Sequence, residues 1–107
     1  MNDSIWTATA WWGKWFMPKV GKLTLEGQRL SFQVGEQLEF DVPLEELQEL
    51  TWHWYSFSAA FETTVRGKPY FLSFLGPGNT LGSWWRGLQR GRQWRAEMTA
   101  RLAHSRQ

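Results

Sequence analysis

The sequence of 107 residues contains no cysteine, which excludes a disulfide, a thiolate zinc site and a cysteine nucleophile. It has two histidines, and no GxSxG motif, HExxH motif or phosphate-binding glycine loop occurs in it. We therefore expect no enzymatic activity, no metal and no cofactor. Nothing in a chain without cysteine indicates an oxidising compartment, which favours the cytoplasm as its location.

Long apolar runs are also missing. The longest uncharged stretch, residues 69–85, is interrupted by residues that a membrane-spanning helix does not tolerate together, namely Gly76, Pro77, Gly78, Asn79 and Gly82. The first residues lack a basic segment followed by a continuous apolar one, so we expect no signal peptide. The length predicts a single domain over residues 1–107.

The charge is distributed unevenly. Residues 1–80 carry a net charge of −3, whereas residues 81–107 carry +5. The basic segment contains Glu97 and six arginines, namely Arg86, Arg90, Arg92, Arg95, Arg101 and Arg106. Such a segment favours an anionic partner or serves solubility. The acidic first part of the chain and the lack of an RNA-binding sheet motif argue against nucleic acid as that partner.

Apolar residues alternate with period two from Ile5 to Phe74, which predicts β-strands. The clearest part is a three-stranded meander over residues 21–43, with Gly27 and Gly35 in its turns. Its predicted inward residues are Leu23, Leu25, Leu30, Phe32, Val34, Leu38, Phe40 and Val42. Pro43 ends the third strand, and a short bridge follows that turns Leu44, Leu47 and Leu50 inward.

Four more strands are predicted at about 5–17, 51–57, 59–66 and 69–75, which gives seven in all. A helix is predicted from about residue 80 to residue 104. Its apolar face is expected to contain Trp84, Leu88, Gly91, Arg95, Met98 and Leu102. Gly87 and Gly91 near this face indicate either a close approach to the sheet or a locally weak helix.

Three segments resemble the GRAM and bacterial pleckstrin-homology-like family. The segment VGKLTLEGQRLSFQV is similar to the family's succession of a glycine, a leucine pair, a turn and an "rLxF" strand. The segment FDVPLEELQEL resembles the family's bridge, and RGKPYFLSF resembles one of its later strands. The similarity covers most of residues 14–105. It implies a PH-like barrel of seven antiparallel strands capped by the C-terminal helix, a fold that hosts lipid binding, peptide binding and scaffolding.

The resemblance also implies a lipid-binding loop between the first two strands. Here the loop is KWFMPKVGK, whose basic and apolar residues suit an anionic membrane surface, and we assign to it Lys14, Trp15, Phe16, Lys19 and Lys22. The phosphoinositide signature of eukaryotic relatives is absent, since Leu23 and Thr24 follow Lys22. Strict alternation gives an alternative in which Trp15 and Met17 are inward residues of a long first strand.

Nine tryptophans are far more than a barrel of this size needs for its core. Adjacent aromatic residues on one strand point to opposite faces, and only one of these faces can line the core. The outward rings either lie over their own sheet or form an interface, which we assign to Trp11, Trp12, Trp52, Trp54, Tyr55 and Phe57. His53, within the same strand, is interpreted as a packing residue.

The sequence thus predicts a non-enzymatic binding or scaffold domain that associates with itself or another protein through outward aromatic residues. The alternative is a peripheral module for anionic membrane lipid that uses the first loop. Self-association would be insensitive to salt, whereas attachment to anionic lipid would weaken as the salt concentration rises.

Overall fold

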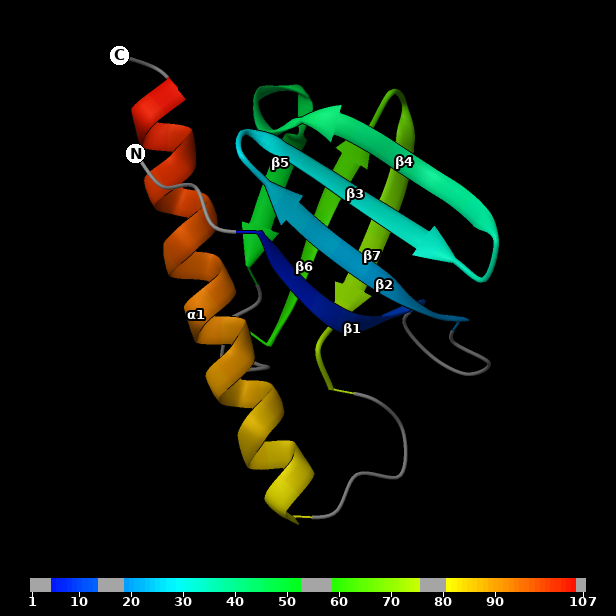
Figure 1. Ribbon diagram of the computed structural model, residues 1–107, viewed down its shortest axis with the longest axis vertical. Helices are drawn as coiled ribbons and strands as arrows, with labels where there is room; N and C mark the ends of the chain where they lie inside the picture. Colours follow the sequence, from blue (N-terminus) through cyan, green and yellow to red (C-terminus); the bar gives the residue numbers. More distant parts are fainter. Residues whose placement is uncertain (1–4, 14–18, 53–58, 76–80, 106–107) are drawn as a thin grey trace.

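The computed structural model describes residues 5–13, 19–52, 59–75 and 81–105 (Figure 1). The described part contains strands, a single turn of 3-10 helix and one long helix. In chain order they are β1 (Trp6–Trp12), β2 (Lys19–Glu26), β3 (Arg29–Val34), β4 (Gln37–Pro43), η1 (Leu44–Glu46), β5 (Gln48–Trp52), β6 (Ala60–Val65), β7 (Lys68–Ser73) and α1 (Leu81–Ser105).

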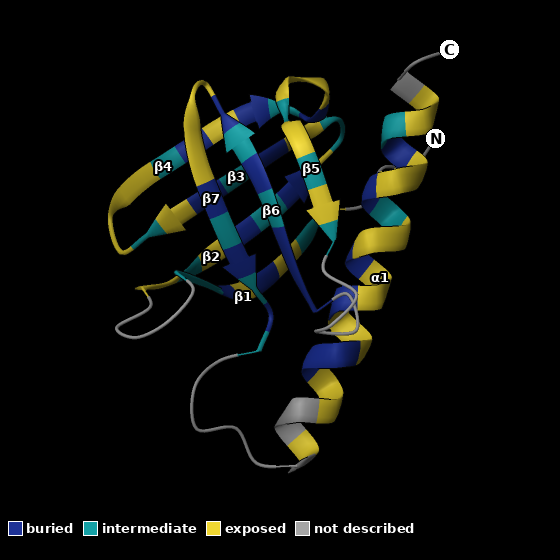
Figure 2. Ribbon diagram, turned by 180° about the vertical axis from the view of Figure 1, so that it is seen from behind, coloured by how far each residue is buried: buried dark blue, intermediate teal, exposed yellow. Residues whose placement is uncertain are grey.

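The strands form one antiparallel sheet of seven strands in the order β4-β3-β2-β1-β7-β6-β5. The sheet curls, so that β2, β3 and β4 lie in front of β5, β6 and β7 in Figure 1 and behind them in Figure 2. Strand β1 joins the two halves because it pairs with β2 along its whole length and with β7 at Trp11 and Trp12. Seven antiparallel strands and one C-terminal helix are therefore confirmed, whereas the strand pairing leaves the sheet open between β4 and β5.

The predicted alternation of the meander is confirmed at most positions. The side chains that enter the core are Leu23, Leu25, Leu30, Phe32, Phe40 and Val42. Leu38 is an error of prediction, because 55% of its surface is exposed. The pairing of β3 with β4 shifts by one residue between Phe32 and Gln33, so that Leu38 lies opposite the outward Gln33. This β-bulge reverses the face on which Leu38 lies.

The bridge after Pro43 packs as expected. Leu44 is buried in η1, and Leu47 and Leu50 pack against the core from partly exposed positions. Strand β5 begins at Gln48, three residues earlier than predicted, and it contains a bulge between Gln48 and Thr51. The remainder of the predicted strand, residues 53–58 with His53, lies outside the described residues.

Helix α1 begins and ends within one residue of its predicted bounds. Its buried face, dark blue in Figure 2, contains Leu88, Gly91, Trp94, Met98 and Arg101. The prediction placed Arg95 on this face, and the structure corrects it, because Arg95 is exposed and Trp94 is buried. Trp94 fixes the rotation of the helix by packing edge-on against Trp6, with ring centroids 5.9 Å apart, and against Phe74 at 5.5 Å. The side chain of Trp84 lies outside the described part.

The predicted close approach of a helical glycine to the sheet is confirmed at Gly87. A methyl group at this position would meet Leu75 Cδ2 and would lie 3.0 Å from the carbonyl oxygen of Phe74. Glycine therefore allows the first half of α1 to lie directly on the end of β7.

The second half of the helix is held by a buried arginine. Arg101 is 3% exposed and donates from Nε to Glu97 Oε2 at 2.7 Å and from Nη1 to the carbonyl oxygen of Gly27 at 2.9 Å. Gly27 has φ of 59° in the turn between β2 and β3, where glycine adopts this conformation without strain. Arg101 thus ties the helix to a turn 74 residues earlier in the chain.

Candidate binding surfaces

A cluster of aromatic rings and lysines lies where β1 ends and β7 begins. The ring of Trp12 lies 5.1 Å from that of Tyr70 and 6.3 Å from that of Phe32, so one side of it packs on the core. The ammonium groups of Lys19 and Lys68 lie 5.3 and 4.8 Å from the centroid of the same indole. Cation–π attraction holds both charges beside one ring.

Glu39 connects this cluster to the opposite half of the sheet. The β-bulge in β4 turns the side chain of Glu39 inward, so that only 10% of it is exposed. Its Oε1 atom lies 3.5 Å from Lys68 Nζ and 3.4 Å from Tyr70 Oη. Burial raises the pKa of Tyr70. The positive charge of Lys68 lowers this pKa, and the negative charge of Glu39 raises it. The phenol therefore stays protonated at neutral pH and donates a hydrogen bond to Glu39.

Two hollows flank this cluster. One of about 360 Å³ lies between β4 and the β6–β7 turn, with Glu39, Phe40, Lys68 and Tyr70 in its lining. The other, of about 430 Å³, lies over β6 and β7 and includes Trp12, Phe71, Glu49 and Glu62. Both have aromatic floors and charged rims, which suits the binding of a ligand or a polypeptide surface. Among the described residues, no three histidine, aspartate or glutamate side chains come together as a metal site.

The predicted lipid-binding residues do not form one patch in the described part of the chain. Lys19 and Lys22 are both exposed, but they lie three positions apart on β2 and therefore on opposite faces of the sheet. Lys19 lies beside Trp12, whereas Lys22 lies opposite Thr9 on the outer face. Lys14, Trp15 and Phe16 lie outside the described residues.

Two of the predicted interface tryptophans pack on the core instead of pointing away from it. Trp12 contacts Phe32 and Tyr70, and the ring of Trp52 lies 4.7 Å from that of Phe61. The indole nitrogen of Trp52 is itself buried. The prediction that Trp52 lies outside the core is therefore wrong. Trp54, Tyr55 and Phe57 fall outside the described residues.

Trp11 is the predicted interface residue that does face outward. It alternates with the inward Ala10 and Trp12, and it lies opposite Val20 of β2 and Ser73 of β7. Val20 is 53% exposed, and Phe71 lies on the same outer face, two residues before Ser73. We call Trp11, Val20 and Phe71 the outer patch. It covers neighbouring positions on β2, β1 and β7.

Three residues of this cluster were not predicted from the sequence, namely Glu39, Lys68 and Tyr70. Lys68 and Tyr70 could have been found, because they alternate on one face of the strand that follows the Arg66–Gly67 turn. Glu39 could not, since regular alternation places it on the outer face of β4 and only the bulge turns it toward Tyr70. Bulges have no clear signature in a single sequence.

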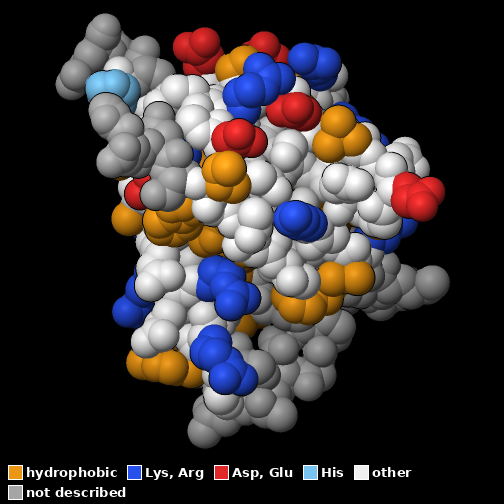
Figure 3. All heavy atoms as spheres, viewed as in Figure 1, with side chains coloured by type: hydrophobic (Ala, Val, Ile, Leu, Met, Phe, Trp, Pro, Cys, Tyr) orange, Lys and Arg blue, Asp and Glu red, His pale blue; other side chains and the backbone are white. Residues whose placement is uncertain are grey.

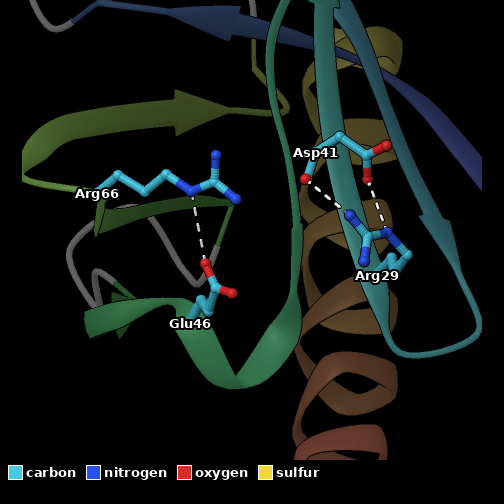
Figure 4. Close-up of polar contacts among 4 residues, drawn as sticks. All are labelled: Arg29, Asp41, Glu46 and Arg66. Carbon is cyan, nitrogen blue, oxygen red and sulfur yellow. Dashed lines mark hydrogen bonds and ion pairs between the residues drawn. The ribbon is translucent and has the colours of Figure 1, made fainter.

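The basic residues of the sheet and those of the helix differ in their partners. Arg29 Nε lies 3.1 Å from Asp41 Oδ1 and Arg66 Nε lies 3.6 Å from Glu46 Oε1, as Figure 4 shows. Figure 3 shows acidic side chains gathered toward the upper end of one face and basic side chains along its lower part, over α1 and the neighbouring strands. The helix thus contributes positive charge with few carboxylates beside it.

The fold defines a class, a mainly β domain whose seven-stranded antiparallel sheet is followed by one C-terminal helix. No family model and no curated protein sequence matches the chain. Among solved structures, it is similar to the crystal structure of the C-terminal domain of an unknown protein from Leishmania infantum, with a TM-score of 0.55 and 21% sequence identity. The alignment covers 90% of this chain and 81% of that chain, and at this identity it establishes the fold alone. No described helix is long and apolar enough to cross a membrane.

Proposed function

We propose that this chain is a non-enzymatic binding domain of PH-like, GRAM type that associates with a second copy of itself. The order of seven antiparallel strands, the curled sheet and the helix packed along it support a PH-like barrel. The observation that carries the self-association is the outer patch, in which Trp11 faces away from the core beside the exposed Val20. Outward-facing aromatic residues such as Trp11 and Phe71, both half-buried, are enriched at protein interfaces.

The positions beside the patch favour a second copy as its occupant. Strands β2, β1, β7 and β6 are consecutive in the sheet, with Lys22 on the β2 side of the patch and Glu62 on the β6 side. A two-fold axis along the boundary between β1 and β7 brings the β2 side of one copy toward the β6 side of the other. The apolar residues of the two outer patches then meet at the centre, as expected for an isologous dimer.

The Trp11→Glu variant tests this proposal. We expect the wild-type chain of 12.6 kDa to have about twice this mass by light scattering at high micromolar concentration, and the variant to be monomeric. A buried glutamate at the centre of the interface would be desolvated without a partner, whereas it is solvated in the monomer. The thermal midpoint of a monomeric variant at low concentration should not change, because Trp11 lies outside the core.

Thr7→Glu is the matched control, since Thr7 is exposed on the same face of β1 but four residues from the patch. It should keep the dimer. A wild-type chain that is monomeric at the same concentration, or equal dissociation by both variants, would contradict the proposed interface. The dimer should also persist in high salt, since an apolar centre is not screened.

A second candidate function is attachment to an anionic membrane, and the position of Lys19 favours it. Lys19 and Lys68 flank the indole of Trp12. Lys68 has Glu39 as a partner, whereas Lys19 has no carboxylate partner among the described residues. A lysine beside a half-buried tryptophan suits the boundary between water and lipid headgroups.

Co-sedimentation with phosphatidylserine vesicles at low salt tests this second function. We expect Lys19→Gln to reduce vesicle binding about fivefold, which corresponds to about 1 kcal/mol for one basic residue at an anionic surface. Arg29→Gln is the control, because its side chain is paired with Asp41 on β4. Unchanged binding of the Lys19 variant, or equal binding to phosphatidylcholine vesicles, would remove membrane attachment through this cluster.

A further inference from the structure

The edge of β1 that faces the helix is only partly covered by another strand. Strand β1 pairs with β7 at Trp11 and Trp12, and over Trp6–Ala10 the sheet pairing on this side shows no strand among the described residues. Helix α1 passes the beginning of β1 on this side, as Figure 1 shows, with Trp94 packed against Trp6. Side chains fill the inner part of the space between the strand and the helix, and the outer part is open.

This open part is a groove of about 400 Å³ lined by Thr7, Ala8 and Thr9 of β1, Lys22 of β2 and Arg90 of α1. Its two charged residues come from opposite walls and are both positive. The two threonines are exposed and contribute hydroxyl groups. Among the described residues, no carboxylate lines the groove. We call it the β1–α1 groove.

Neither cation of the groove is neutralised by the rest of the described chain. The hydrogen bonds and ion pairs of the described residues include none to Lys22 or Arg90, whereas Arg29, Arg66 and Lys68 each have a carboxylate partner. Elsewhere on the sheet, acidic residues of this sequence do form ion pairs with the basic ones. The described lining of the groove contains only the two positive charges of Lys22 and Arg90.

The helix adds to this charge. Arg86 lies one turn before Arg90, so the two repel each other on one side of α1, and the first turn of the helix contains no acidic residue. This repulsion opposes folding when no anion is present, and an anion held between α1 and β1 relieves it.

We propose that the β1–α1 groove binds a phosphoryl group, held by Lys22 and Arg90 with hydroxyl donation from Thr7 and Thr9. A guanidinium, an ammonium and hydroxyl groups are the donors that proteins use for phosphate, whose several oxygens accept from all of them together. The volume of the groove exceeds that of a phosphate alone and accommodates a phosphate ester. This site shares only Lys22 with the flank of the outer patch and no residue with the cluster around Trp12, so it goes beyond the proposed function.

Inorganic pyrophosphate is the probe for the test, and backbone amide resonances of the full chain are the measurement. We expect saturable shifts at the amides of Thr7, Ala8 and Thr9. Lys22→Gln and Arg90→Gln should each weaken binding about tenfold, because each removes a charge-assisted hydrogen bond. Both side chains are exposed, so an unchanged thermal midpoint verifies the fold of each variant.

Arg92→Gln is the matched control, because Arg92 is exposed on α1 but lines a different hollow, with Arg95 and Ala96. It should leave pyrophosphate affinity within about twofold, which is the effect expected from long-range charge at moderate salt. Equal loss in the Arg90 and Arg92 variants would overturn the proposal, since it would show diffuse attraction to the helix. Absence of shifts at Thr7–Thr9 would overturn it as well.

Phosphatidylserine vesicles distinguish the source of the phosphoryl group. If Arg90→Gln loses affinity for both vesicles and pyrophosphate, the groove takes a lipid headgroup. If it loses affinity for pyrophosphate and keeps vesicle binding, the groove takes a soluble phosphate ester. Failure of the Trp11→Glu or Lys19→Gln tests does not bear on this result, because neither residue lines the groove.

Discussion

Replacing Trp94 with alanine is expected to lower the free energy of unfolding by about 3–5 kcal/mol, as for other large aromatic side chains removed from a core. Trp94 is 2% exposed and is the contact between the helix and two strands, through Trp6 of β1 and Phe74 after β7. Its removal leaves a cavity that the rings of Trp6 and Phe74 cannot fill unless the helix moves. Urea denaturation followed by far-ultraviolet circular dichroism measures the loss.

Trp85 provides a control of the same residue type on the same helix. Its side chain is 54% exposed, and Trp85→Ala should change the free energy of unfolding by no more than about 0.5 kcal/mol. If Trp94→Ala proves too unstable to measure, Trp94→Phe should show a smaller loss in the same direction. Equal effects at positions 85 and 94 would contradict the packing of α1 described above.

The second large effect is expected at the buried arginine of α1. Removal of Glu97 breaks its ion pair with the guanidinium of Arg101, which is 3% exposed. Loss of one partner of a fully buried pair costs about 3–5 kcal/mol. The side chain of Glu97 is 32% exposed, so water compensates in part, and we expect about 2 kcal/mol for Glu97→Ala.

A double-mutant cycle with Arg101→Met tests the coupling. Met keeps much of the apolar stem of Arg101 but removes its bond to the carbonyl oxygen of Gly27. Because the Glu97 substitution acts mainly through the loss of its ion pair with Arg101, the double variant should be more stable than the sum of the single losses predicts, by at least about 1 kcal/mol. Additive losses would show that Glu97 and Arg101 do not depend on each other.

The regular parts of the fold could be predicted because they depend on local periodicity. Alternation over residues 21–43 was enough to place Leu23, Leu25 and Phe32 in the core, and the helix bounds were right within one residue. Leu38 was placed on the wrong face because a bulge adds one residue to β4, and nothing in the local pattern reports it. The predicted rotation of α1 about its own axis was also wrong, by about one residue, because Trp94 is buried in place of Arg95. It depends on Trp6 and on the carbonyl oxygen of Gly27, which are distant in sequence.

The candidate sites were less predictable, because they depend on which strands are neighbours. The number of tryptophans indicated that some of them face outward, as Trp11 and Trp85 do. It could not separate them from Trp12 and Trp52, which pack on Phe32 and Phe61. Lys19 and Lys22 were grouped as one loop, although alternation along β2 separates them. The β1–α1 groove required the helix to be placed beside β1, which a sequence without an alignment does not give.

The position of β1 at the centre of the sheet has a consequence for the order in which the chain can fold. During synthesis the meander of β2, β3 and β4 can pair with β1 early, because these contacts are local. The pairing of β1 with β7 must wait for residues 72 and 73, and the burial of Trp6 must wait for Trp94. Until then the inner face of the half-sheet, with Ala10, Leu23 and Phe32, is exposed on the ribosome. Cellular yield of the chain should therefore depend on chaperones that bind nascent apolar strands.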